Sequence, residues 1–251
     1  LIYLVQGTNL QLERGTFQLL VIAGAVPGIL AVLVLILLVH DVRTEARRVP
    51  FPSLRLAGFD RSFKAFVLIS LLFTLGNSSD AFLVLRAQSL GIPAFHISLL
   101  LVLFNLVYAL GSTPFGAMSD KWGRPRVLLI GWLLYGLVYL GFALAWASWQ
   151  LWLLYPLYGV YYAMADGVGR ALVADLVTPD QRGTAYGAYH TVIGLAALPA
   201  SVIAGLLWQG IGPWGGFGPH APFLLGAFMA LLSASLFAKW LGTANQSPKA
   251  A

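Results

Sequence analysis

The sequence predicts an all-α membrane protein, and three observations support this prediction. Hydrophobic residues make up 59% of the 251 residues, charged residues only 10%, and mean hydropathy is +0.81. In soluble domains about a quarter of the residues are charged. Apolar runs close to the roughly 20 residues that a helix needs to cross the hydrocarbon core recur about seven times. These runs are apolar on every face rather than alternating, which favours helices over a membrane β-barrel.

The apolar runs that predict these helices are separated by polar or turn-forming segments. In chain order they lie near 19–39, 64–86, 95–118, 127–149, 151–176, 184–208 and 221–239. Ahead of them, residues 1–7 read as the last turns of a further apolar helix rather than as a signal peptide. We therefore expect the chain to be the C-terminal part of a longer protein.

Proline, glycine and capping residues mark where several of the runs begin and end. Pro50 and Pro52 discourage a helix through the long polar stretch that we interpret as a cytoplasmic linker over 40–62. At 178–181 the sequence TPDQ supplies an N-cap threonine, a proline at the first helical position and a glutamine three residues after the cap. A capping box is therefore expected there. Glycines and prolines at 210–219 predict the outer loop before the last run.

The distribution of charge predicts how the helices are oriented. Once the runs are threaded across a bilayer, all of the 15 Lys and Arg residues except Arg14 and Arg86 fall on one side. By the positive-inside rule this side, with the C-terminus, is cytoplasmic. The other boundary carries tryptophans, which prefer the headgroup level: Trp146, Trp149, Trp152, Trp208 and Trp214. The net charge of +6 is thus a topology signal, and no nucleic-acid partner is expected.

The segment GAMSDKWGRPRVLL, residues 116–129, is a short hairpin rich in glycine and charge between two membrane-length runs. Gly116 allows close helix approach, and Gly123 permits a positive φ in a tight turn. Arg124 and Arg126 can reach carboxylates or lipid phosphates. Taken alone, the same residues also fit an ordinary positively charged cytoplasmic loop.

The spacing in this hairpin resembles the signature loop of the major facilitator superfamily. That loop reads Gly, any residue, Leu, Ala or Ser, Asp, Arg or Lys, any residue, Gly and two basic residues. Here Met118 stands for the leucine, Lys121 takes the place of the commoner arginine, and Pro125 interrupts the basic pair. Residues 175–187 are similar to the loop between the fourth and fifth helices of a six-helix half, and residues 17–39 to the helix that closes the first half.

The resemblance implies a stretch of this fold from the end of the fifth helix through the twelfth helix. The chain would then hold the six-helix C-terminal bundle of the facilitator fold plus the last helix of the N-terminal bundle. The corresponding division is 1–39 for the remnant of the N-terminal bundle, 40–62 for the basic cytoplasmic linker, 63–240 for the six-helix bundle and 241–251 for a cytoplasmic tail. The missing N-terminal half of the same protein and the lipid bilayer are the implied partners.

For function, the resemblance implies alternating access, in which two bundles rock around a central site. In relatives the hairpin aspartate contacts the positive N-terminal end of a helix from the opposite half and latches the cytoplasmic side closed. Asp120 is the matching position, with Arg124 and Asp175 as expected partners in a charge cluster. The expected gate loop consists of Gly116, Asp120, Lys121, Gly123, Arg124, Arg126, Asp175 and Arg182.

Polar residues inside the runs are the candidates for handling substrate or protons, because ionisable groups at membrane depth are costly and usually face a cavity. These candidates are Asn77, Asp80, Asn105, Tyr162, Asp166, Arg170 and His190. Asp80 is expected in the outer third of its run, with Asn77 on the same helical face. It is either a proton site or a structural cap or partner for Arg86.

A stripe of residues three or four positions apart runs along 151–176 and consists of Tyr155, Tyr158, Tyr162, Asp166 and Arg170. Asp166 and Arg170 are either a switchable charge pair that faces a cavity or an interhelical ion pair that holds the bundle together. His190 is either a proton relay or a hydrogen-bonded packing residue. Asn105 lies in the middle of its run.

Together these features favour a secondary active transporter in the plasma (inner) membrane that moves a small organic solute and is coupled to protons. Efflux as an antiporter is favoured slightly over uptake. A solute uptake symporter and a non-transporting membrane sensor or scaffold with the same fold are the alternatives. The chain has no ATP-type phosphate loop, no HExxH or GxSxG motif and no cysteine. We therefore expect no enzymatic activity, no metal site and no cofactor.

Overall fold

The computed structural model describes residues 14–38 and 58–244. In these ranges the chain folds into helices, in the order α2 (Arg14–Leu38), α3 (Arg61–Gly76), α4 (Ala81–Ser89), α5 (Ala94–Trp122), α6 (Arg124–Leu144), α7 (Leu151–Asp175), α8 (Arg182–Gln209) and α9 (Ala221–Ala244). The short 3-10 turns η2 (Ser148–Gln150) and η3 (Pro179–Gln181) precede α7 and α8. The prediction of an all-α membrane protein is confirmed for the described part of the chain.

Most of these helices are long and apolar enough to cross a bilayer. The candidate spans in the described ranges are Val21–Leu38, Arg61–Ser89, Ala94–Trp122, Arg124–Leu144, Pro179–Gln209 and Ala221–Thr243. α7 has 25 residues, which is also a spanning length, but its tyrosines together with Asp166 and Arg170 make it more polar. Every run predicted from the sequence therefore contains a helix, although one run is interrupted and several boundaries differ.

One predicted helix is interrupted. The sequence predicts a continuous helix near 64–86, but α3 ends at Gly76 and α4 begins at Ala81. Asn77 has φ −97° and ψ 83°, which is not helical. The intervening Asn, Ser, Ser and Asp side chains compete for backbone hydrogen bonds; for example, the Ala81 amide donates to Ser79 Oγ at 3.3 Å. The prediction that Asn77 and Asp80 share a helical face is therefore wrong.

The turn in the hairpin at 116–129 is shorter than the composition of this segment predicts. α5 continues through Trp122 and α6 begins at Arg124, so Gly123 alone makes the turn. Its φ of 92° lies in the region that favours glycine. At its other end α6 stops at Leu144 rather than near 149, because Ala145 is extended with φ −62° and ψ 127°.

The start of α8 also differs in detail from its prediction. Thr178 precedes η3 with ψ 154°, but its side chain makes no capping hydrogen bond, so the predicted capping box is wrong. The chain does turn helical at Pro179, first as a 3-10 turn and then as α8. Predictions for residues 1–13, for 40–57 of the linker and for the tail after Ala244 lie outside the described residues.

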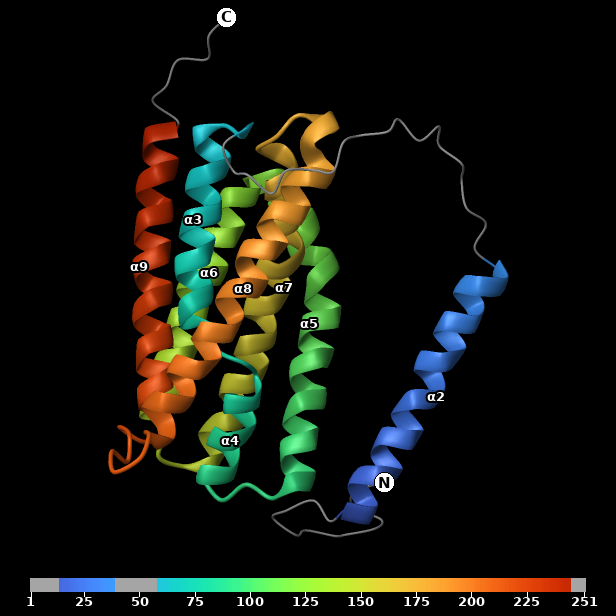
Figure 1. Ribbon diagram of the computed structural model, residues 1–251, viewed down its shortest axis with the longest axis vertical. Coiled ribbons are helices and arrows are strands. Elements are labelled where there is room, and N and C mark those ends of the chain that lie inside the picture. The colour runs from blue at the N-terminus through green and yellow to red at the C-terminus, as the bar shows by residue number, and fades with distance from the viewer. Residues whose placement is uncertain (1–13, 39–57, 245–251) are drawn as a thin grey trace, which may run out of the picture.

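The helices from α3 to α9 form one bundle (Figure 1). Inside it α6 packs against α7 and α9, α5 against α7, and α3 against α8 and α9. The start of α3, the α5–α6 turn and the end of α9 lie at one end of the bundle, and α4 lies near the other. α2 stands apart from the bundle, and the part of it that is apolar enough to span is fully exposed.

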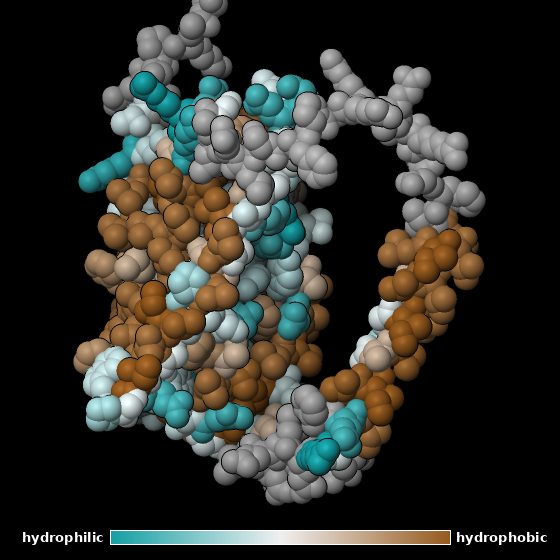
Figure 2. Space-filling view, in the orientation of Figure 1, coloured by the Kyte–Doolittle hydropathy of each residue, from teal (hydrophilic) through white to brown (hydrophobic). Residues whose placement is uncertain are grey.

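The core of the bundle is aromatic, whereas its flank is aliphatic. Its largest fully buried side chains include Tyr135, Tyr139, Tyr155, Tyr158, Phe63, Phe66, Phe142, Phe223 and Phe237. Figure 2 shows apolar residues over the side of the bundle where α9 lies and hydrophilic residues gathered at the end where α9 finishes, with further hydrophilic residues in the middle of the visible face and at the opposite end. An apolar flank is what contact with lipid tails requires.

Candidate functional site

The break between α3 and α4 holds two of the predicted polar residues. Tyr158 donates a hydrogen bond from its hydroxyl to Asp80 Oδ1 at 2.7 Å, and Tyr162 donates to Asp80 Oδ2 at 3.4 Å. The Tyr135 hydroxyl lies 3.3 Å from Asn77 Oδ1 and also reaches the Gly76 carbonyl. Tyrosines of α6 and α7 therefore hold the polar groups exposed by this break.

Asp80 has neither of the structural roles that its sequence position suggests. It precedes α4 but makes no side-chain cap, and Arg86 has other partners. The Arg86 guanidinium, on a residue only 2% exposed, donates to the carbonyls of Phe142 at 3.0 Å and Ala145 at 2.6 Å. The alternative in which Asp80 caps a helix or pairs with Arg86 is therefore wrong, because the break points Asp80 at tyrosines from another helix.

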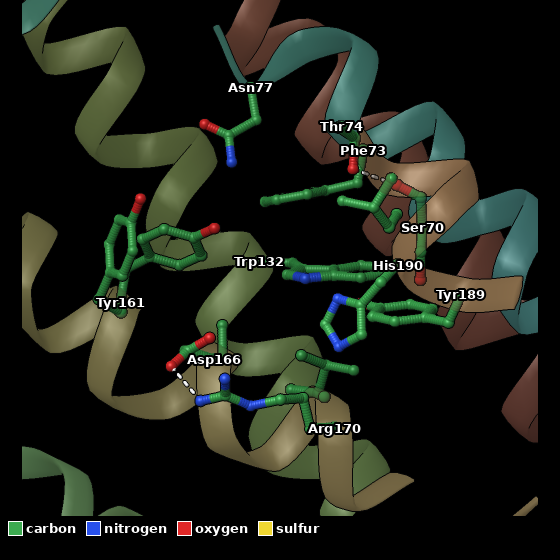
Figure 3. Close-up of a pocket in the computed structure, with 15 residues that line it drawn as sticks. Ser70, Phe73, Thr74, Asn77, Trp132, Tyr161, Asp166, Arg170, Tyr189 and His190 are labelled. Carbon is green, nitrogen blue, oxygen red and sulfur yellow. Dashed lines mark hydrogen bonds and ion pairs between the residues drawn. The ribbon is translucent and has the colours of Figure 1, made fainter. Parts of the chain in front are cut away.

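A cavity of about 270 Å³ opens between α3, α6, α7 and α8 (Figure 3). Phe73 and Trp132 stack along its wall, with ring centroids 4.7 Å apart and an interplanar angle of 13°. The residues that line it are Ser70, Phe73, Thr74, Asn77, Leu128, Trp132, Tyr161, Tyr162, Ala165, Asp166, Gly169, Arg170, Tyr189, His190 and Ile193. Flat rings with a few polar groups form the kind of wall that binds small organic molecules.

Asp166 and Arg170 face this cavity as an ion pair. Arg170 Nη2 lies 2.5 Å from Asp166 Oδ2, and the two residues are one turn apart on α7. Of the two alternatives, the interhelical ion pair is therefore wrong, because both charges belong to one helix, and a switchable pair stays a prediction. The link between helices comes from Tyr108 of α5, whose hydroxyl donates to Asp166 Oδ2 at 2.6 Å.

The charged residues at the α5–α6 turn form a cluster around Arg124. Its Nη1 lies 2.5 Å from Asp175 Oδ1 at the end of α7, and its Nη2 lies 3.3 Å from Asp120 Oδ1 on α5. Arg124 also donates to the Ala171 carbonyl at 3.1 Å. The cluster joins the ends of α5, α6 and α7, and the structure brings together the three residues that the sequence groups around Asp120.

The remaining predicted residues lie in different surroundings. His190 is exposed beside the cavity, with its ring 5.4 Å from that of Tyr189. Asn105 is exposed on α5 and donates to its own helix at the Leu101 carbonyl, away from the cavity. The other gate-loop residues are partly or fully exposed at the same end of the bundle: Gly116, Lys121, Gly123, Arg126 and Arg182.

Several cavity residues are missing from the sequence-based candidates, namely Ser70, Phe73, Thr74, Trp132, Tyr161 and Tyr189. Their sequence signal is weak, because aromatic and hydroxyl side chains are common on any buried helix face. Tyr108, which does not line the cavity but donates a hydrogen bond to Asp166, is also missing from those candidates. In the described ranges, no three His, Asp or Glu residues come together as a metal site would require.

Membrane-length helices around a cavity with aromatic and polar walls define a multi-pass membrane protein with a cavity between its helices. The chain belongs to the Major Facilitator Superfamily, whose sequence model matches residues 65–251. The family prediction is thereby confirmed, and the partial match is consistent with the C-terminal half of the family's domain. Proteins of this superfamily are in general non-enzymatic carriers that move small molecules across membranes.

Relatives of known sequence cover different shares of the chain. An uncharacterized MFS-type transporter of Methanocaldococcus jannaschii is 38% identical over 227 residues, which are 88% of this chain and 55% of that protein. The class B tetracycline resistance protein of Escherichia coli is 29% identical over 145 residues, 58% of this chain and 34% of that protein. The class C protein of the same organism is 31% identical over 136 residues, which are 54% of this chain and 32% of that protein. The chain thus spans about half the length of the first relative and about a third of the other two.

Proposed function

We propose that this chain is the C-terminal half of a secondary active transporter that moves a small organic solute by alternating access. The observation that carries the proposal is the cavity between α3, α6, α7 and α8, where rings and a charge pair line about 270 Å³ at membrane depth. Ionisable residues are retained at that depth where they serve a substrate or ion pathway. The missing N-terminal half supplies the opposite wall of the site.

The proposed coupling ion is the proton, and the proposed direction is efflux across the plasma (inner) membrane. The proposed proton sites are Asp166, which lines the cavity, and Asp80, which is exposed in the hollow beside it. Similarity to tetracycline resistance proteins supports export of an organic compound over uptake. The Asp120–Arg124–Asp175 cluster serves as the cytoplasmic gate of this half, because it ties three helix ends together with charges that can separate.

Transport by the full-length protein in liposomes tests this proposal. With a proton gradient imposed, a panel of organic solutes is screened; exchange of one proton for one solute concentrates the solute about tenfold on the acid side per pH unit. A symporter would instead concentrate it on the alkaline side. We expect Asp80→Asn and Asp166→Asn to lose proton-driven accumulation, and Asp180→Asn in η3, an exposed residue outside the cavity, to retain it.

The outcomes separate the alternatives. Movement of no solute under any gradient would favour a non-transporting sensor or scaffold. Full proton coupling in both cavity variants would remove Asp80 and Asp166 from the mechanism and leave the transport function itself intact.

A further inference from the structure

Asp80 is an exposed carboxylate at the break between α3 and α4, and it differs from Asp166 in having no positive partner among the described residues. Asp166 is neutralised by Arg170 at 2.5 Å. Asp80 accepts hydrogen bonds from two tyrosine hydroxyls, and in the described ranges no Lys, Arg or His side chain pairs with it. Hydrogen bonds satisfy the carboxylate oxygens but supply no countercharge, so the exposed carboxylate is free to pair with a positively charged group that enters the site.

Asp80 faces an opening that adjoins the aromatic cavity. A hollow of about 350 Å³ is lined by Asn77, Ser78, Ser79, Asp80, Tyr162, Ala197 and Ser201. Asn77 and Tyr162 line both this hollow and the aromatic cavity. A molecule bound between the rings can therefore place one end beside the Asp80 carboxylate.

The rings beside Asp80 are arranged around Tyr162. Its centroid lies 5.1 Å from that of Tyr158 and 5.2 Å from that of Tyr161, with interplanar angles of 73° and 76°. Phe104 approaches it in the same edge-on manner at 5.3 Å. Aromatic faces attract cations that come within about 6 Å of the ring centroid, and attract anions poorly. The rings and the carboxylate therefore both favour positively charged ligands.

We propose that the site selects organic cations, with the positive charge of the solute against Asp80 and Tyr162 and its apolar body between the rings of the aromatic cavity. This inference rests on the proposed transport function and names its substrate class. Proton and solute compete for the same carboxylate. When the cation enters, the O–H bond of protonated Asp80 breaks and the proton passes to water on the side to which the cavity is open. When the cation leaves on the other side, the O–H bond forms again, so one positive charge crosses in each direction.

Binding of a matched pair of ions tests the proposal. Tetraphenylphosphonium and tetraphenylborate have nearly the same size and shape but opposite charge. Equilibrium dialysis of each labelled ion against the purified full-length protein in detergent, with empty micelles subtracted, measures both affinities. We expect tetraphenylphosphonium to bind at least tenfold more tightly, and its binding to release up to one proton. Equal or tighter binding of tetraphenylborate overturns the inference.

Variants of Asp80 identify the residue that carries the preference. We expect Asp80→Asn, which keeps the shape and removes the charge, to weaken tetraphenylphosphonium binding at least tenfold and to abolish proton release. Asp80→Glu keeps the charge and retains the preference for the cation, and Asp180→Asn leaves both affinities unchanged. Unchanged cation binding in a folded Asp80→Asn protein contradicts the proposal. If the Asp80→Asn protein does not fold, proton release by the wild-type protein tests the proposal instead. Cation binding without any proton release would contradict the proposal.

The same measurements distinguish this inference from the function on which it rests. Tight tetraphenylphosphonium binding through Asp80, in a protein that moves no solute in liposomes, would support the cation site and contradict the transport function. Proton-driven movement of neutral or anionic solutes, without affinity for tetraphenylphosphonium, would support the transport function and contradict the cation site.

Discussion

Asp166 takes part in two interactions of different strength. Its ion pair with Arg170 lies within α7, and the two side chains are 34% and 50% exposed. Pairs of this kind contribute about 0.2–0.5 kcal/mol. The hydrogen bond from Tyr108 joins α5 to α7, and a hydrogen bond to a charged group contributes about 1.5–3 kcal/mol. The tyrosine rather than the arginine therefore dominates the stability that Asp166 provides.

Tyr108→Phe should consequently destabilise the protein more than Arg170→Gln. The first variant loses the 2.6 Å hydrogen bond between helices, and the second loses a pair within one helix. We expect a loss of about 1.5 kcal/mol or more for Tyr108→Phe and about 0.5 kcal/mol or less for Arg170→Gln. Unfolding in detergent followed by circular dichroism measures both. Tyr186→Phe, whose hydroxyl has no hydrogen-bond partner in the described ranges, is the control, and the reverse order would contradict the argument.

At this scale the sequence identified the charged residues but not their partners. Asp80 and Asp166 stand out because carboxylates are rare in apolar runs. Their tyrosine partners lie 78 and 58 positions away along the chain, on other helices. Proximity in sequence instead suggested Arg86 for Asp80, but Arg86 donates its hydrogen bonds to carbonyls at the end of α6.

Arg86 fastens α4 to the end of α6. Its guanidinium donates to the carbonyls of Phe142, Ala143 and Ala145, where α6 has no further turn to satisfy them. Positive charge is also favourable at the C-terminal end of a helix. A short helix of nine residues is thereby held in place although it is separated from α3.

Arg86→Met should therefore loosen this end of the bundle. The thioether fills similar space but donates no hydrogen bonds, so buried carbonyls are left unsatisfied at a cost of about 1–3 kcal/mol. The expected result is a lower unfolding midpoint in detergent and faster hydrogen exchange at the end of α6. Arg126→Met, at an exposed position near the α5–α6 turn, is the matched control and should leave both measurements unchanged. Equal unfolding midpoints and exchange rates for the two variants would show that the Arg86 hydrogen bonds contribute nothing to the stability of this end of the bundle.

Close contact between α3 and α9 depends on two glycines that face each other. A Cβ at Gly226 would lie 2.7 Å from the Gly76 carbonyl oxygen and 2.5 Å from the Tyr139 ring. The carbonyl belongs to the backbone of α3 and cannot move aside without separating the two helices. Small residues permit this kind of approach between membrane helices.

Gly226→Ala is expected to destabilise the protein by about 1–3 kcal/mol, because an added methyl group overpacks the crossing. Gly194→Ala provides the comparison, since a Cβ there meets no atom within 4 Å. That change should be neutral or stabilise the helix by up to about 1 kcal/mol. Thermal unfolding of both variants in detergent measures the difference, and a neutral Gly226→Ala would mean that the crossing adjusts at no cost.

For the whole molecule, the sequence predicted the helices better than the cavity. Each apolar run is a local signal, so length and hydropathy placed the helices to within several residues, except that α3 and α4 were predicted as one helix. The cavity instead joins Ser70, Trp132, Asp166 and His190, which lie on four helices. Their proximity depends on which helix faces pack together, and aromatic residues that are suitable for either a core or a binding wall give no local sign of it.

The orientation of the bundle yields a prediction that the chain is well suited to test, because its 251 residues contain no cysteine. Lys121 is exposed at the α5–α6 turn, and Ser148 is exposed in η2 between α6 and α7, at opposite ends of α6. Basic residues gather at the first end, which the positive-inside rule assigns to the cytoplasm. In intact cells a membrane-impermeant maleimide should therefore label Ser148→Cys and should label Lys121→Cys only after permeabilisation. Labelling of Lys121→Cys alone in intact cells would invert the topology, and the Asp120–Arg124–Asp175 cluster would then face the outside and could not serve as a cytoplasmic gate.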